Sequence, residues 1–116
     1  MYQILEELNK TTGINGSMIV GQDGIVIAAD SNSSLQDETV GALAASIVDT
    51  VKKSMDRLSN ENLKQITVEA SKGKLFLTDV GIGILAVTTD PQVNVGLVRL
   101  EIRNAAEKIK LAQKSD

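Results

Sequence analysis

The strand expected at residues 82–89 constrains the fold more than any other segment of the chain. Ile84 and Ala86 alternate with Leu85 and Val87, so a strand here is apolar on both of its faces. A sheet that contains such a strand must be covered on both sides, because neither face can be left in water. The fold is therefore expected to place a sheet between two layers of helices.

The other expected strands are short and are separated by tight turns. Asp23-Gly24, a pair favoured in two-residue hairpin turns, lies between the first two of them. Short strands with such connections favour antiparallel pairing. These four strands are expected at residues 17–20, 25–29, 63–70 and 75–78.

Three segments show the helical period. A short helix is expected near residues 4–8, and a last one begins near Asn94, a residue that suits a helix N-cap. The longest covers residues 35–58, and its apolar stripe is expected to face the sheet. That stripe contains Val40, Leu43, Ile47, Val51, Met55 and Leu58.

The order helix, strand, strand, helix, strand, strand, strand, helix predicts an α+β fold. We expect a five-stranded antiparallel sheet sandwiched between one long helix and two further helices. Residues 1–116 are expected to form a single domain, since domains commonly contain about 100–150 residues.

The chain contains neither cysteine nor histidine, which removes most enzyme chemistry. Disulfides, thiolate or imidazole zinc sites, and Ser–His–Asp or Cys–His catalytic groups cannot form within one chain. Gly81-Ile82-Gly83 does not match a phosphate-binding loop, so its glycines are interpreted as turn residues. We predict no catalytic residue, no metal and no cofactor, and therefore not an enzyme.

Four aspartates at expected strand ends raise one alternative. Asp23, Asp30, Asp79 and Asp90 could in principle share a metal or an acid–base site. Roles in turns and caps explain each of them separately, and this is the favoured interpretation.

Charge and composition also limit the partners. The net charge is −3 and the only aromatic residues are Tyr2 and Phe76, which disfavours nucleic acid. The acidic N-terminal segment does not resemble a targeting sequence. The longest apolar run covers residues 80–87, far fewer than the ~20 residues that a membrane span requires. The expected location is the cytoplasm.

The last expected helix carries a cluster of basic residues, namely Arg99, Arg103, Lys108, Lys110 and Lys114. A solvated helix face with cations near its C-terminal end is the simpler interpretation. A docking surface for an acidic partner is the functional alternative.

The long helix has a second strip of small and apolar residues beside its expected core stripe. If the core stripe covers the sheet, this second strip is left for another contact, and a second copy of the same helix would fit it. The strip, predicted as a dimer interface, contains Gly41, Ala44, Ala45, Val48 and Lys52.

The strand at residues 63–70 supports the same prediction. Its polar face contains Gln65, Thr67 and Glu69, and at a sheet edge its unpaired backbone groups would need protection. Antiparallel pairing with its own copy would protect them, so these three residues are also predicted at the dimer interface. The alternative is an ordinary edge shielded by charged side chains.

The ordered set of motifs is similar to the Roadblock/dynein light chain family. The similarity covers about residues 4–110 and rests on residues 16–29, the alanine-rich long helix, Ile66-Thr67-Val68-Glu69 with Lys72-Gly73-Lys74-Leu75, and Asn94-Val95-Gly96-Leu97-Val98-Arg99. This resemblance implies the Roadblock/longin-like fold. It also implies homodimers or heterodimers that join through the long helix and the middle strand into a continuous sheet.

The resemblance further implies a function. Such proteins bind small Ras-like GTPases, act as scaffolds for them, or adapt dynein to cargo, and the bacterial gliding-motility member stimulates its partner GTPase as a dimer. The sequence thus predicts a non-catalytic dimeric regulator or scaffold of a small Ras-like GTPase. The alternatives are a structural adaptor without effect on GTP turnover and, ranked lower, a small-ligand sensor domain.

Overall fold

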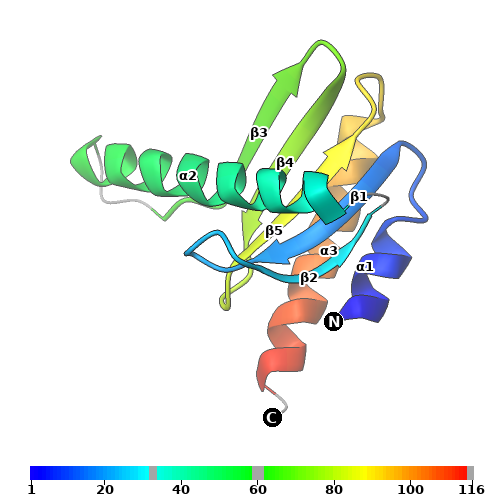
Figure 1. Cartoon of the computed structure of the whole chain (residues 1–116), viewed down its shortest axis with the longest axis horizontal. Coiled ribbons are helices and arrows are strands. Elements are labelled where there is room, and N and C mark those ends of the chain that lie inside the picture. The colour runs from blue at the N-terminus through cyan, green and yellow to red at the C-terminus, as the bar shows by residue number, and fades with distance from the viewer. Residues whose placement is uncertain (32–33, 59–61, 115–116) are drawn as a thin grey trace.

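A computed structural model, which describes residues 1–31, 34–58 and 62–114, shows three helices around one sheet (Figure 1). Helix α2 lies across one face of the sheet, and α1 and α3 lie on the other. The elements in chain order are α1 (Tyr2–Leu8), β1 (Ile14–Val20), β2 (Val26–Asp30), α2 (Ser34–Leu58), β3 (Gln65–Ala70), β4 (Gly73–Asp79), β5 (Ile84–Thr89) and α3 (Val95–Lys114).

The sheet is antiparallel throughout, with the strand order β2-β1-β5-β4-β3. The predicted α+β architecture and the predicted order of elements are confirmed. β5 occupies the centre, between β1 and β4, and β2 and β3 form the two edges. The middle strand of the sequence is therefore an edge strand in space.

The central strand divides the core into two apolar clusters, as its two-sided pattern requires. Leu85 and Val87 pack on the side of α1 and α3, together with Phe76. Ile84 and Ala86 pack on the side of α2. The strand begins at Ile84 instead of at residue 82, because residues 81–83 form the turn from β4.

Helix α3 follows its sequence pattern closely. The Asn94 side-chain oxygen accepts a hydrogen bond from the backbone N–H of Leu97 at 3.0 Å, which confirms the predicted N-cap. The residues that face the sheet and α1 are the predicted ones, apart from the partly buried Val95: Val98, Ile102, Ala105, Ala106 and Ile109 are all buried. A single 3.6-residue stripe thus accounts for the packing of this helix.

Candidate interaction surfaces

The long helix contacts the sheet through parts of both stripes that the sequence analysis described. Ala44 and Val48 are buried in the cluster beneath α2, at 0% and 4% exposure. Leu43 and Leu58, which were expected to face the sheet, are 50% and 80% exposed. The predicted core stripe is therefore only partly correct: Val40 and Ile47 pack against the cluster beneath α2, whereas Leu43 and Leu58 face outward.

The reason for this orientation is the close approach of α2 to the turn between β1 and β2. A Cβ atom added at Gly41 would lie 3.1 Å from the backbone oxygen of Gly24 and 3.2 Å from a methyl group of Val26. Gly24 itself has a φ of 85°, which glycine adopts without strain. Small residues let the helix axis come close to this turn, and larger ones would hold it away.

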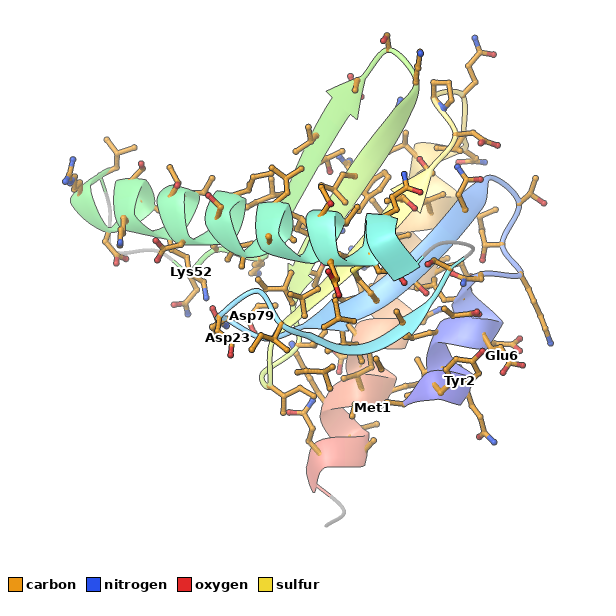
Figure 2. All side chains as sticks on the ribbon, in the orientation of Figure 1. Met1, Tyr2, Glu6, Asp23, Lys52 and Asp79 are labelled. Atoms are coloured by element: carbon orange, nitrogen blue, oxygen red, sulfur yellow. The ribbon has the colours of Figure 1, made fainter. Side chains whose placement is uncertain are left out.

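The remaining two residues of the predicted strip also lie against their own chain. Ala45 is partly buried beside Gly24. The Lys52 ammonium pairs with Asp79 Oδ2 of β4 at 3.1 Å, and Figure 2 shows this side chain reaching from α2 toward Asp79. Within one chain the strip therefore packs mainly against its own sheet and the β1–β2 turn, and Ala45 and Lys52 keep part of their surface exposed.

An apolar groove lies along the outward flank of α2. It has a volume of about 480 Å³, and Val40 and Leu43 of α2 face Val68 and Leu75 of β3 and β4 across it. Leu43 is the most exposed of these four side chains, and the others are buried or partly buried. At the groove, α2 leaves part of this face of the sheet uncovered.

The edge strand β3 borders this groove. It pairs with β4 along one side only, from Gln65 opposite Thr78 to Ala70 opposite Gly73. Ile66 and Val68 turn toward the α2 side and pack against its cluster. The alternating residues Gln65, Thr67 and Glu69 are partly buried or exposed, as their predicted polar face requires.

The aspartates at the strand ends serve turns and local contacts. Asp23 Oδ1 accepts a hydrogen bond from the backbone N–H of Ile25 at 3.0 Å, and Asp79 Oδ1 accepts one from Gly81 at 2.8 Å. Asp90 accepts one from the Asn15 amide. Among the residues that the structure describes, no three acidic side chains gather closely enough to hold a metal ion.

Asp30 contacts two residues near the N-terminus, Tyr2 and Asn9. Its backbone oxygen and carboxylate accept hydrogen bonds from the Asn9 amide at 2.7 and 3.1 Å. Its negative charge raises the pKa of the nearby Tyr2 hydroxyl above its usual 10.0, with smaller contributions from desolvation, from Glu6 and from the Tyr2–Asp30 hydrogen bond. Tyr2 therefore stays protonated at neutral pH, and its exposed position at the surface is unlike that of a catalytic acid or base.

The cations of α3 separate into two groups. Arg99, Arg103 and Lys110 line a polar hollow of about 630 Å³ between α3 and the β3 edge. Lys108 lies on the other side of the helix, toward α1. Sequence periodicity could have separated these groups, because residues 99, 103 and 110 are spaced at whole helical turns and residue 108 is not. The Lys114 side chain lies outside the described residues.

No helix in the described part of the chain combines the length and the apolar character needed to cross a bilayer.

Comparison with protein families places the chain among proteins of this architecture. The model of the Roadblock/LC7 domain matches residues 1–89. Two uncharacterized proteins of Methanocaldococcus jannaschii are each 44% identical to this chain over 108 residues, which cover 93% of this chain and 95% of each relative. The chain belongs to the Roadblock/LC7 family.

Solved structures agree with this fold. A Roadblock/LC7 domain from Streptomyces avermitilis superposes with a TM-score of 0.92 at 16% identity and covers 98% of both chains. MglB from Myxococcus xanthus gives 0.86 at 24% identity, over 99% of this chain and 95% of MglB. Another MglB structure, described as a tetrameric arrangement, gives 0.84 at 20% identity, over 93% of this chain and 83% of MglB.

Proposed function

We propose that this protein is a non-catalytic dimeric regulator or scaffold that binds a small Ras-like GTPase. The observation that carries the proposal is the exposed apolar flank of α2, on a chain that belongs to the Roadblock/LC7 family. Leu43 is half exposed beside an apolar groove, and a large aliphatic side chain in that position gains most when a second apolar surface covers it. The fold is similar to that of MglB, and members of the family that it resembles bind small Ras-like GTPases. This resemblance supports a GTPase as the partner.

A second copy of the chain is the proposed occupant of the groove. Two α2 helices related by a two-fold axis would place the same patch against itself, so that each Leu43 enters the groove of its partner. The edges of the two β3 strands could then pair, which would satisfy their free backbone groups. The proposed interface contains Leu43 and the predicted residues Gln65, Thr67 and Glu69. Ala44 and Val48 of the predicted helix strip are already buried against their own sheet.

The substitution Leu43→Glu tests this interface. A charge buried between two apolar helices costs several kcal/mol, so the variant should be a monomer at concentrations where the unmodified protein is a dimer. Gel filtration with light scattering measures the mass. Leu111→Glu is the matched control, because Leu111 is 63% exposed on α3, away from the groove. An unmodified protein that is a monomer at high concentration would contradict the proposal.

The function itself is tested with a small Ras-like GTPase of the same organism. Binding is measured by calorimetry with the GTPase in its GDP and GTP-analogue states, and single-turnover hydrolysis is measured with and without this protein. A platform that binds one state more tightly shifts the population of the switch loops toward that state. Binding with a changed hydrolysis rate identifies a regulator. No binding in any nucleotide state would remove both roles.

The adaptor alternative predicts two different outcomes. An adaptor would co-purify with larger proteins from native cells and would leave GTP hydrolysis unchanged. The lower-ranked sensor alternative predicts a small molecule retained in the groove beside α2 through purification, which mass spectrometry would detect.

A further inference from the structure

The hollow between α3 and the β3 edge has an excess of positive charge, although the protein as a whole is acidic. Its lining contains five cations and two carboxylates, a local excess of three positive charges in a chain whose net charge is −3. The cations come from separate parts of the chain: Lys64 precedes β3, Lys52 belongs to α2, and the others belong to α3. The fold has thus collected charges that the sequence leaves dispersed.

Most of these cations are available to a ligand. Lys52 is already paired with Asp79, but the side chains of Lys64, Arg99, Arg103 and Lys110 are exposed. Within the described residues none of these four forms an ion pair, and Arg99 donates only a weak hydrogen bond, at 3.4 Å, to the Thr67 hydroxyl.

The spacing of the cations indicates the shape of ligand that they can bind. Arg99, Arg103 and Lys110 follow one face of α3 and span eleven residues, or about 16 Å of helix axis. An extended polypeptide covers that distance with about five residues. A compact anion would need cations that converge on one point, and a nucleic acid would need a longer basic surface and aromatic residues on which bases stack.

We propose that this hollow docks an acidic, extended segment of a partner protein, with carboxylates that alternate along the α3 row. Lys64 binds from the β3 side and the two arginines bind from the α3 side, where planar guanidinium groups form paired hydrogen bonds with carboxylates. The hollow shares no lining residue with the α2 groove. Gln65 of the proposed dimer contact lies at its rim, so the oligomeric state of each variant is measured together with its peptide affinity.

The probe for this site is a fluorescein-labelled peptide of about eight residues that alternates glutamate and serine, long enough to cover the row. Fluorescence anisotropy should show saturable binding to the unmodified full chain at low ionic strength. A rise to about 0.5 M salt should weaken this binding, because exposed charges are screened. A glutamine–serine peptide of equal length should not bind.

The double variant Arg99→Gln/Arg103→Gln should lower the affinity by about tenfold, the sum expected for two exposed charge contacts. The control is Lys108→Gln/Lys10→Gln, which removes the same net charge from exposed positions outside the hollow. All four side chains are exposed, so both variants should keep the circular dichroism spectrum and the thermal midpoint of the unmodified protein.

Three results would overturn the proposal. The unmodified chain could fail to bind the acidic peptide, or the control could lose as much affinity as the arginine variant, which would indicate only an effect of net charge. Vesicles of phosphatidylserine could also bind to the arginine-dependent surface in place of the peptide. None of these results bears on the GTPase experiment, because that experiment measures a different partner.

Discussion

Helices α2 and α3 cover opposite faces of the same sheet but are held there by different means. In α3 large side chains fill the core, with Ile102 and Ile109 almost completely buried. In α2 the contact depends on small residues around Ala44, while Leu43 stays half exposed. The contrast teaches that the largest apolar side chains of a helix need not mark the face that is buried within its own subunit.

The difference follows from what lies beneath each helix. Below α3 is a cluster of large side chains, including Phe76, and ridges of large residues pack well into it. Below α2, beside an apolar cluster of its own, is the turn that contains Gly24, where backbone atoms come within about van der Waals contact of the helix. A helix can approach a backbone that closely only when its own side chains are small.

The first prediction, with the greatest expected loss of stability, tests the packing of α3 against the sheet. Ile102→Ala removes a side chain that is 1% exposed and leaves a cavity, so the free energy of unfolding should fall by about 2–5 kcal/mol. Urea denaturation followed by circular dichroism measures the loss. Leu100→Ala on the same helix, at 48% exposure, is the control and should cost less than about 1 kcal/mol. Equal losses in the two variants would mean that α3 is not held by its buried stripe.

The second prediction tests the close approach of α2. Gly41→Leu places a large side chain against Gly24 and Val26, and this overpacking should cost about 1–3 kcal/mol of stability. The same denaturation experiment measures it. Thr50→Leu is the control, since this exposed position of α2 has room for the larger side chain. A stabilised Gly41 variant would show that α2 does not depend on small residues at this turn.

A third, smaller effect concerns the start of α3. Asn94→Ala removes the side-chain oxygen that caps the backbone N–H of Leu97, and this loss should cost about 1 kcal/mol. Asn94→Asp keeps an acceptor in the same place and should retain most of the stability. If both substitutions cost the same, the hydrogen bond does not contribute to the cap.

The smallest expected effect concerns the ion pair that ties α2 to β4. Lys52→Met removes the partner of Asp79, but both side chains are more than a third exposed. The loss should therefore be about 0.2–1 kcal/mol at low salt. Since exposed charges are screened, the difference between this variant and the unmodified protein should shrink in 1 M salt, and thermal unfolding at the two ionic strengths measures it. A larger difference at high salt would exclude an electrostatic contribution.

The prediction of the binding surfaces was less complete than that of the fold. Periodicity identified the polar face of β3 and the apolar and polar sides of α3, because each contains one clear stripe. The long helix has two adjacent stripes, one of small and one of large residues. Which residues of these stripes pack against the sheet depends on the distance between the helix and the β1–β2 turn. That distance is not encoded in the spacing of residues within the helix, so the burial of Ala44 and Val48 within the chain could not be predicted from that spacing.

The number and order of the elements, the antiparallel pairing and the need for helices on both sides of the sheet can all be read from the amino-acid sequence. These depend on local periodicity and turn chemistry, which nearby residues define. Which flank of α2 is exposed, and which cations gather beside β3, are seen only in the folded chain. Both outcomes depend on contacts between residues far apart in the chain, and only the folded backbone brings Gly24 to α2 and Lys64 to Arg103.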